Sequence, residues 1–580
     1  MKRLSTFFAV LTLAAALLLS SCGAETGTTT VAAGSATSAV TASSLTAAVA
    51  ELSYTDLGID EANLSFDIAD AVDVTLADGA SEGGGGVSVD GDTVTITGAG
   101  TYHVSGTLSS GSLVVDAPDE VVNLMLDGVG ITAASVAAIN VVDAEQVVVW
   151  LADGSDNVLA DATGSVVDET VDDSPNATLF STSDLRIAGE GELSVTAHAA
   201  DAITSKDTLV LAGGDITVDA ADDGVRGKDH LVITGGTLTA DVQGDALRSD
   251  NESVTDEPDA AVGVIWIDGG TLDLTAGSDA VDAARQVTVL SGNLTIAAGD
   301  DGLHSDDVLR IAGGTVNITQ SNEGIEGAYM YLSGGDVSVV SADDGINVSG
   351  GAEALTATTD VATTGRESGT AGDQTMAGGV GPESQFTTTD AVEDLASLTV
   401  SAMVGSGFGG PAEADNGTRF LEFSGGTYVI DATSDGVDVN GAMTMTDGTL
   451  VVSGTDDARN GAIDVDDAFT ISGGTLAANG MSSMAVAPGE GSTQATLAIT
   501  FSGTVPADTL ITITDGDGEQ IASFTTLKAS QSFIYSSDAL VAGADYAISV
   551  GGEVTGTSIG WPVLDGTATG GDTIGTVAAA

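Results

Sequence analysis

The 580-residue chain contains little cysteine, little aromatic side chain and little basic charge. Its one cysteine, Cys22, excludes an internal disulfide and leaves the rest of the chain without a thiol. Aromatic residues make up 4% of the sequence, and 13 Lys and Arg stand against 85 Asp and Glu, for a formal net charge of −72. Because this charge repels phosphate groups, nucleic acids and anionic lipid headgroups are excluded as favourable partners.

Glycine, in contrast, is abundant, with 78 residues mixed among Val, Ile, Leu, Thr and Asp. This composition is typical of many short strands joined by tight turns and disfavours helices. The length allows several domains or one long repeat structure with a large core. We therefore expect an all-β fold.

The N-terminal segment, "MKRLSTFFAVLTLAAALLLSSC", combines Lys2 and Arg3 with a short apolar stretch and a cysteine. This order is typical of a bacterial lipoprotein signal that is cleaved before Cys22, whose sulfur is then acylated. Residues 23–44 are rich in Ser, Thr, Ala and Gly, as in a flexible tether, and no later segment is apolar enough to predict a transmembrane helix. We expect an exported protein, anchored at the bacterial cell envelope or surface through its lipid alone.

The chain then repeats a short unit marked by paired glycines or a related turn. The second residues of these turns are Gly191, Gly214, Gly236, Gly270, Gly292, Gly314, Gly335, Gly426, Gly448 and Gly474. Successive markers differ in sequence number by 23, 22, 34, 22, 22, 21, 91, 22 and 26, and the recurring value near 22 is the period of a solenoid. After the glycines, runs such as "TLTAD" and "TVNIT" place an aliphatic residue at every second position, as in a strand with one buried face.

Two or three strands per unit, without helical periodicity, predict a parallel β-helix of about 22 residues per coil, and chirality favours the right-handed form. A leucine-rich repeat has a similar period but requires a helical half that this sequence lacks. Residues 492–552 alternate as antiparallel strands, which predicts a C-terminal β cap or, alternatively, an independent sandwich. The expected segments are a signal peptide over 1–22, a tether over 23–50, the β-helix over 51–480 with insertions at about 251–263 and 352–420, the cap over 481–555 and a tail over 556–580.

Acidic residues recur at one position of the repeat, nine residues after the glycine marker. They are Asp223, Asp245, Asp279, Asp301, Glu323, Asp344 and Asp435, with Asp201 one residue later in its unit and Asp222, Asp300 and Asp343 one residue earlier in theirs. Equivalent positions of successive coils lie about 4.8 Å apart. Two unit charges at that distance repel by about 0.9 kcal/mol in water and by about 3.5 kcal/mol at an effective dielectric constant of 20. The predicted column of carboxylates therefore requires positive charge.

Two sources of positive charge are consistent with the sequence. Three residues past the acid, Arg226, Arg248 and His304 face the same side, with Lys206 and Lys228 nearby. Elsewhere this position holds Asp282, Glu326, Asn347 and Asp438, where only a bound cation would neutralise the acids. Oxygen ligands without thiols favour Ca²⁺, and four scattered histidines do not indicate a zinc site. The simpler alternative is that each acid hydrogen-bonds only its own turn. The candidate metal ligands are Asp222, Asp223, Asp245, Asp279, Asp300, Asp301, Glu323, Asp343, Asp344 and Asp435.

Long blocks of the sequence resemble a known family. They are "GTYHVSGTLSSGSLVVDA", "DDGVRGKDHLVITGGTLTADVQGDALRSDN" and "NGAIDVDDAFTISGGTLAANG" followed by "SSMAVAPGEGSTQATL", spread over about 90–555. The chain is similar to the bacterial carbohydrate-binding β-helix proteins typified by a clostridial cellulose- and pectin-binding protein. The resemblance implies a calcium-binding, right-handed parallel β-helix, similar in shape to pectate lyases but regarded as a binding protein. The chain departs from that pattern where Ala246 and Ala280 replace the glycine after the acid.

The first functional hypothesis is a surface-anchored protein that binds polysaccharide along the β-helix, with Ca²⁺ bridging protein carboxylates to the uronates of pectin-like chains. Cellulose-like chains are permitted by the resemblance, but stacking on neutral sugars needs exposed aromatic rings. Only Trp150, Trp266 and Trp561, with a few tyrosines such as Tyr329 and Tyr331, are available, and Trp150 is expected in the core.

Two alternatives remain open. A calcium-dependent polysaccharide lyase would need a base, for which Lys206, Lys228, Arg226 and Arg248 are the candidates, although neutralisation of neighbouring acids is the simpler explanation of them. A structural adhesin would use calcium only for rigidity. The sequence shows no nucleophile elbow, phosphate loop or zinc motif of other enzyme classes.

Overall fold

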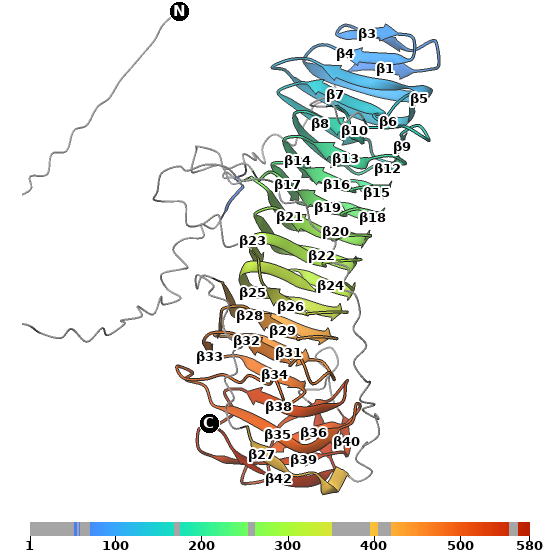
Figure 1. Ribbon diagram of the computed structural model, residues 1–580. Coiled ribbons are helices and arrows are strands. Elements are labelled where there is room, and N and C mark those ends of the chain that lie inside the picture. Colours follow the sequence, from blue (N-terminus) through green and yellow to red (C-terminus); the bar gives the residue numbers. More distant parts are fainter. Residues whose placement is uncertain are drawn as a thin grey trace, which may run out of the picture. The chain divides into compact units, whose positions relative to one another are not determined.

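The computed structural model describes residues 52–54, 57, 70–167, 174–252, 262–350, 395–403, 419–555 and 566–580. These residues are all-β apart from the short 3-10 helix η2 (Leu395–Ser397), and 36 strands belong to one large sheet (Figure 1). Residues 52–580 cluster as one compact unit. The signal peptide, the tether, Cys22, most of the two insertions and Trp561 lie outside the described residues.

The sheet consists mainly of three stacks of parallel strands, each of which receives a strand from successive coils. The first stack contains β7 (Ile139–Asp143), β10 (Ala177–Ser181), β13 (Asp201–Ser205), β16 (Val225–Gly227), β19 (Leu247–Ser249), β21 (Val281–Ala283), β23 (Leu303–Ile311), β25 (Ile325–Ser341), β26 (Ile346–Val348), β29 (Val437–Val439) and β32 (Ile463–Val465).

The second and third stacks follow along each coil. The second contains β6 (Val121–Ala133), β8 (Gln146–Leu151), β11 (Asp184–Gly189), β14 (Thr208–Leu211), β17 (His230–Ile233), β20 (Val264–Ala276), β22 (Gln286–Ala297), β23, β25, β28 (Phe420–Ala432), β30 (Ala442–Met445) and β33 (Phe469–Ile471). The third contains β9 (Asp156–Ala160), β12 (Glu192–Ala197), β15 (Asp215–Ala220), β18 (Thr237–Val242), β20, β22, β24 (Thr315–Gln320), β25, β28, β31 (Thr449–Ser453) and β34 (Thr475–Gly480).

The strand register agrees with the spacing of the glycine markers. Asp215 pairs with Thr237, Thr237 with Thr271, and Thr271 with Asn293, so paired positions are offset by the same amounts as the markers of those coils. The longest gap between markers, from Gly335 to Gly426, is matched by the pairing of Asp336 with Thr427.

The markers themselves stack tightly. Gly236 has a φ of +84°, and a Cβ there would lie 2.8 Å from the carbonyl carbon of Gly213. A side chain at this turn would therefore force neighbouring coils apart.

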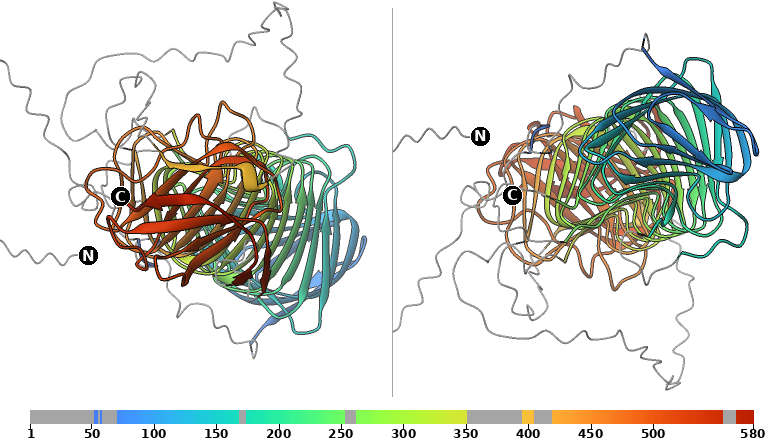
Figure 2. Two further views of the ribbon diagram at one scale, coloured as in Figure 1. Left: turned by 90° about the horizontal axis from the view of Figure 1, so that it is seen from below. Right: turned by 90° about the horizontal axis from the view of Figure 1, so that it is seen from above.

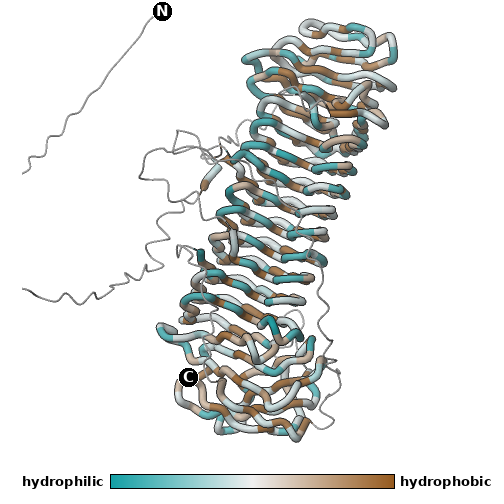
Figure 3. The backbone as a smooth tube through the Cα atoms, in the orientation of Figure 1, coloured by the Kyte–Doolittle hydropathy of each residue, from teal (hydrophilic) through white to brown (hydrophobic). Residues whose placement is uncertain are grey.

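The core follows from the two-residue alternation of the strands, visible as alternating colours in Figure 3. In β15, Ile216, Val218 and Ala220 are buried, whereas Asp215, Thr217 and Asp219 are exposed. One continuous apolar cluster joins such residues from Val74 to Ile534. The same alternation corrects the expectation for Trp150: β8 directs Val147 and Val149 inward, which leaves Trp150 partly exposed.

The outward-facing residues of the third stack change from polar to apolar where the C-terminal strands cover them. Thr217, Thr239 and Thr295 are exposed, but the equivalent residues farther along the stack are Val429, Val451 and Ala477, which are buried. These three pack with the apolar side chains of the C-terminal strands. Polar residues therefore mark the part of this face that solvent or a ligand can reach.

The strands at the two ends differ from the stacks. The N-terminal strands are β1 (Val72–Leu76), β2 (Glu82–Gly83), β3 (Val87–Asp90), β4 (Thr93–Ile96) and β5 (Gly100–Asp116). The C-terminal strands are β27 (Val400–Ala402), β35 (Thr496–Val505), β36 (Leu510–Thr514), β37 (Gln520–Thr525), β38 (Ser530–Ser536), β39 (Asp545–Val550), β40 (Glu553–Thr555), β41 (Thr567–Thr569) and β42 (Asp572–Ala578).

The C-terminal strands combine features of both arrangements considered from the sequence. Strand β38 pairs antiparallel with β34 and so continues the large sheet, whereas β37, β36, β39 and β42 form a separate four-stranded sheet. Figure 2 shows this end of the molecule from below. Strand β42 falls in residues 556–580, assigned above to a tail, and pairs with β39. Strand β27 falls in the insertion at 352–420 and pairs with β35.

The segment before the first coil packs against the outside of the second stack. Leu57 is 1% exposed and belongs to an apolar cluster with Val210, Val232 and Trp266. The ring of Tyr54 lies 6.0 Å from that of Trp266, and the Tyr54 hydroxyl donates to Asp268 Oδ2 at 2.7 Å. The chain therefore contacts β14, β17 and β20 before it enters β1.

We predict that Leu57→Asp releases this segment, because a buried leucine contributes about 1.5–3 kcal/mol and a buried carboxylate is unfavourable. In a background with Trp150 and Trp561 replaced by Phe, Trp266 fluorescence should shift to the red. Val158→Asp is the matched control, because Val158 is 46% exposed. An unchanged spectrum in Leu57→Asp would contradict the contact.

Candidate functional site

The recurring acids align along the first stack, at the turn that precedes each strand. We call Asp201, Asp223, Asp245, Asp279, Asp301, Glu323, Asp344 and Asp435 the acid ladder. In each coil the residue two positions later is fully buried in the core, as Val225, Leu247 and Leu303 show. Since these core residues pair in register, they fix the height and direction of every acid.

Several ladder carboxylates also accept a backbone hydrogen bond from the turn of the next coil. Asp223 Oδ1 accepts the backbone N–H of Asp245 at 3.0 Å, Asp245 Oδ1 that of Asp279 at 3.1 Å, and Asp279 Oδ1 that of Asp301 at 2.8 Å. Asp344 accepts from Asp435 at 2.9 Å in the same way. These bonds join neighbouring coils, whereas the simpler alternative considered from the sequence placed the bond within the acid's own turn. They occupy one oxygen of these carboxylates and leave the negative charge in place.

The turns at Ala246 and Ala280 have the same hydrogen bonding as the glycine turns. Ala246 N–H donates to the carbonyl of Asp279 at 3.0 Å, Ala280 N–H to that of Asp301 at 2.9 Å, and Gly302 N–H to that of Glu323 at 3.0 Å. Gly302 does not have a positive φ, so the backbone conformation of this position does not itself require glycine. The departure from Asp-Gly leaves the ladder intact.

Burial makes the charge of the ladder costly. Asp201, Asp223, Asp245 and Asp301 are 2%, 4%, 5% and 7% exposed. Burial, followed by the neighbouring acids, raises the pKa of Asp223 to about 7 and that of Asp435 to about 7. Burial is also the largest cause that raises the pKa of Asp201 to about 6 and that of Asp279 to about 6. The highest value is that of Asp301, whose pKa is raised to about 9 by burial together with a hydrogen bond to Glu326.

A second row of side chains lies three residues past the acids, on the adjoining strands. This flanking row consists of Thr204, Arg226, Arg248, Asp282, His304, Glu326, Asn347, Asp438 and Asp464. Two of its members are arginines at one end, and the members from Asp282 onward are mostly acids. The flanking row therefore divides the ladder into two parts with different electrostatics.

The arginines neutralise the first part. Arg248 Nη1 lies 2.8 Å from Asp245 Oδ2 and 3.4 Å from Asp223 Oδ2. Arg226 pairs with Asp250, and its Nη1 lies 3.7 Å from Asp201 Oδ2. Burial lowers the pKa of Arg226, but the hydrogen bond and charge of Asp250 outweigh it and raise the pKa overall. Both arginines are therefore held as charged partners of the acids.

The second part lacks such partners. Among the described residues, no lysine or arginine lies within ion-pairing distance of Asp301, Glu323, Asp344 or Asp435. In the flanking row, burial raises the pKa of Asp438 to about 7, and the acids around it add to the effect. Carboxylates in this part must therefore take up protons or cations.

Four groups of three side chains bring potential metal ligands within 4.8 Å of one another. They are Asp201, Asp222 and Asp223; Asp279, Asp300 and Asp301; Asp279, Asp282 and His304; and Asp301, His304 and Glu326. The predicted ligands Asp222, Asp223, Asp279, Asp300 and Asp301 are thus brought together. Asp245, Glu323, Asp343, Asp344 and Asp435 are not part of such a group among the described residues.

The sequence did not single out Asp464 or Asp250. Asp464 pairs with Asp438 in the coil after the last predicted ligand, and Asp250 is the partner of Arg226. Asp464 lies three residues past Gly461, so its own coil has no ladder acid to mark it. Asp464 is found when positions are counted along the paired strands, where it lies opposite Asp438, and not from a ladder acid.

The candidate bases of the lyase hypothesis differ in environment. Arg226 and Arg248 are bound to acids, as described. Burial, followed by the charges of Arg226 and Lys228, lowers the pKa of Lys206, whose Nζ lies 6.0 Å from the centre of the Phe180 ring. Of the four candidates, Lys206 therefore has the environment closest to that of a base.

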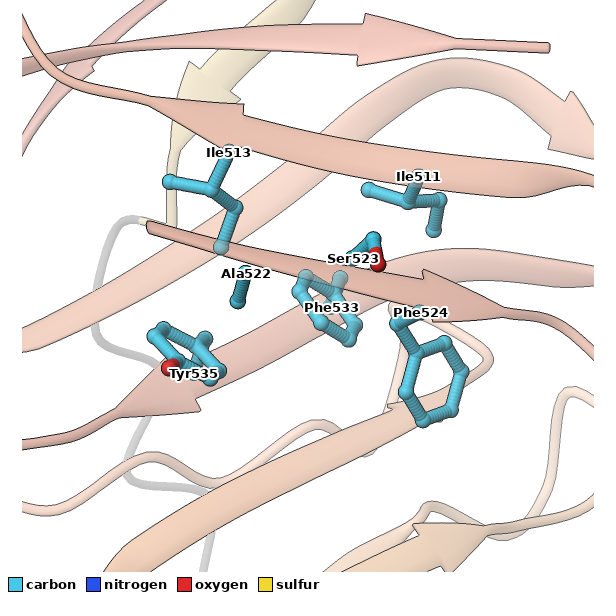
Figure 4. Close-up of a pocket in the computed structure, with 7 residues that line it drawn as sticks. All are labelled: Ile511, Ile513, Ala522, Ser523, Phe524, Phe533 and Tyr535. Carbon is cyan, nitrogen blue, oxygen red and sulfur yellow. The ribbon is translucent and has the colours of Figure 1, made fainter. Parts of the chain in front are cut away.

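The C-terminal strands contain a small apolar space. A small space of about 150 Å³ in the C-terminal strands is lined by Ile511, Ile513, Ala522, Ser523, Phe524, Phe533 and Tyr535 (Figure 4). Most of these residues belong to the apolar core of that region. Within the described ranges, no helix has the length and apolar character needed to cross a membrane.

Comparison with known proteins shows the family to which the chain belongs. The family model of carbohydrate-binding domain-containing proteins matches residues 90–345 and 297–458. A carbohydrate-binding domain-containing protein of Acetivibrio thermocellus is 47% identical over 205 residues, which cover 35% of this chain and 70% of the relative. The chain belongs to the carbohydrate-binding domain-containing proteins.

A solved structure is also similar to part of the chain. It is that of the polysaccharide lyase-like protein from C. thermocellum, as a gadolinium derivative, with 32% sequence identity and a TM-score of 0.40. The match covers 42% of this chain and 97% of that protein.

The raised pKa values predict how stability changes with pH. A folded-state pKa above the unfolded value means that the folded protein holds extra protons, so stability is greatest below about pH 4 and falls as pH rises through the folded pKa. For Asp435, with a pKa of about 7, the loss falls between about pH 4 and 7. In EDTA, Asp435→Asn should therefore raise Tm at pH 8 and leave it unchanged near pH 4.

The Tm of Asp435→Asn should rise by about 2–4 °C for each kcal/mol of charge repulsion that the substitution removes, or by less in a chain of this length. Asp215→Asn is the matched control, because Asp215 is exposed on β15 and the charge change is identical. Thermal unfolding followed by circular dichroism measures both. Parallel pH profiles for wild type and Asp435→Asn would show that the buried charge does not limit stability.

Proposed function

We propose that this protein is an exported lipoprotein that binds polysaccharide along a calcium-loaded acid ladder. Membership of the carbohydrate-binding domain-containing proteins supports polysaccharide as the partner. The observation that carries the site is the row of Asp301, Glu323, Asp344 and Asp435, whose pKa values are raised by burial and which have no lysine or arginine within ion-pairing distance among the described residues. A surface of this charge binds an acidic polymer only when a cation lies between them.

The proposed architecture is a closed, right-handed parallel β-helix. Three stacks of parallel strands share one apolar core and repeat at nearly constant register, which is the arrangement of a chain that winds around a single axis. Right-handed connection between parallel strands is the rule for such crossovers. This winding superimposes the same turn of every coil, so it generates the ladder.

The residues fit calcium by their chemistry. Asp201, Asp222 and Asp223 form one all-oxygen group, and Asp279, Asp300 and Asp301 form another. Asp222 and Asp300 are exposed, whereas Asp223 and Asp301 are buried, so each group joins core-fixed carboxylates to one that solvent can reach. Hard oxygen ligands of this kind suit Ca²⁺. Bound calcium would neutralise the ladder and offer further coordination to oxygens of a sugar chain.

Exported, lipid-anchored attachment at the cell envelope is part of the proposal. It rests on residues 1–22, with Cys22 as the lipidated residue, and on the Ser/Thr-rich stretch that follows. Acyl chains on Cys22 would be the protein's contact with the membrane.

We predict that full-length mature protein is retained by insoluble polygalacturonate in Ca²⁺ and that EDTA weakens retention at least tenfold, which is about 1.4 kcal/mol. The double variant Asp300→Asn/Asp301→Asn should lose retention in Ca²⁺. Asp215→Asn/Asp219→Asn carries the same charge change on the exposed face of β15 and should bind as wild type. Equal retention in Ca²⁺ and EDTA would exclude the calcium bridge, and the absence of retention on any polysaccharide would favour a structural adhesin.

A calcium-dependent lyase is the second candidate, favoured by the lowered pKa of Lys206. The base would take the proton beside the uronate carboxyl group while the glycosidic oxygen leaves, and an unsaturated sugar end would form. If so, Lys206→Ala should abolish the ultraviolet absorbance of the unsaturated product and keep polymer binding.

Lys528→Ala is the control for this variant, because Lys528 is paired with Asp431 in the C-terminal region. Wild-type protein that forms no unsaturated product from polygalacturonate in Ca²⁺ would exclude the lyase and leave the binding proposal unchanged.

A further inference from the structure

His304 occupies a distinct place in the flanking row. It lies on β23, where it pairs with Asp282 on β21 and with Glu326 on β25. Among the described residues of the row it is the single imidazole, and it stands where the row changes from arginines to acids. Its side chain is 24% exposed, so it is fixed by its neighbours but reachable from solvent.

The imidazole is oriented by a carboxylate. His304 Nδ1 lies 3.0 Å from Asp282 Oδ1, which is hydrogen-bond distance. His304 Nε2 lies 3.8 Å from Asp306 Oδ1, beyond that distance. Histidines that bind metals commonly donate one ring N–H to a carboxylate and ligate through the other nitrogen. Asp282 and His304 have this arrangement.

Two carboxylates meet the imidazole. Ligand atoms of Asp301, His304 and Glu326 all lie within 4.8 Å of one another. The ligand atoms of a tetrahedral zinc ion are separated by roughly 3.3 Å, so modest side-chain rotation would close the set. The three residues come from successive coils or their turns, and the buried Leu303 and Ile325 beside them hold the backbone in place.

An independent feature indicates a missing ligand at this place. Asn347, the register partner of Glu326 in the next coil, is 8% exposed. Its Nδ2 donates to Glu323 Oε2 at 2.7 Å, but its buried Oδ1 has no hydrogen-bond partner among the described residues. A buried amide oxygen without a partner is unfavourable. A cation held by Glu326 and its neighbours would supply that partner.

The donor set differs from the all-oxygen groups. A nitrogen donor with carboxylate oxygens suits first-row divalent ions such as Zn²⁺, whereas Ca²⁺ prefers oxygen alone. We propose that Asp301, His304 and Glu326 bind a first-row divalent cation, represented by Zn²⁺, with Asp282 positioning His304 and Asn347 Oδ1 facing the ion. This site goes beyond the proposed function and does not depend on polysaccharide binding. It would cross-link successive coils, and it departs from the expectation that the histidines are irrelevant to metal binding.

The test is zinc titration of chelator-treated mature protein by calorimetry without calcium, because Asp301 also belongs to the oxygen-only group with Asp279 and Asp300. Wild type should bind zinc, and His304→Gln should weaken binding at least tenfold. Asp282→Asn, a positioning variant, should weaken it roughly 10- to 100-fold without removing a ligand. His198→Gln is the matched control, since His198 Nδ1 lies 2.7 Å from Asp161 Oδ1 but joins none of the four groups.

Replacement of zinc by Co²⁺ gives a second readout, because a visible absorption band from nitrogen and oxygen ligands should be present in wild type and absent in His304→Gln. Circular dichroism shows whether each variant is folded, and an unfolded His304→Gln would be replaced by Glu326→Gln, which keeps the side-chain shape. Failure of zinc to bind the calcium-free protein, or equal affinity in wild type and the His304 variant, would overturn the proposal. Loss of polygalacturonate retention alone would bear on the calcium bridge and not on this site.

Discussion

The in-register stacking of buried carboxylates is the interaction on which the rest of this structure depends. Asp223, Asp245 and Asp279 each accept the backbone N–H of the next acid, so these acids help to set the coil-to-coil distance that brings their charges together. Removing an acid would leave an unpaired N–H in the following turn, whereas keeping it retains the repulsion. The fold and its electrostatic strain therefore arise from the same side chains.

The ladder relieves this strain in different ways along its length. At Asp223 and Asp245, Arg248 supplies positive charge. From Asp301 onward the flanking row adds acids, and charge balance must come from solution.

The repeat made much of this arrangement predictable. Glycine spacing predicted the strand register, including the two coils that carry insertions, because a strand pairs with the nearest equivalent strand however long the loop between them. Counting from those markers located the ladder and the flanking row. Contacts that do not recur from coil to coil were not predicted. They include the packing of Tyr54 and Leu57 with Trp266 and the pairing of β42 with β39.

The sequence by itself determined the all-β class, the register of the coils and the identity of the stacked acids, because alternation and period act through neighbours along the chain and between adjacent coils. Tertiary structure alone decided which acids are buried, which gain an arginine and which meet in groups. Those properties depend on distances of a few ångströms between side chains from different coils. Asp250 pairs with Arg226, and Asn347 donates a hydrogen bond to Glu323, only because the coils are stacked, and no local pattern encodes either contact.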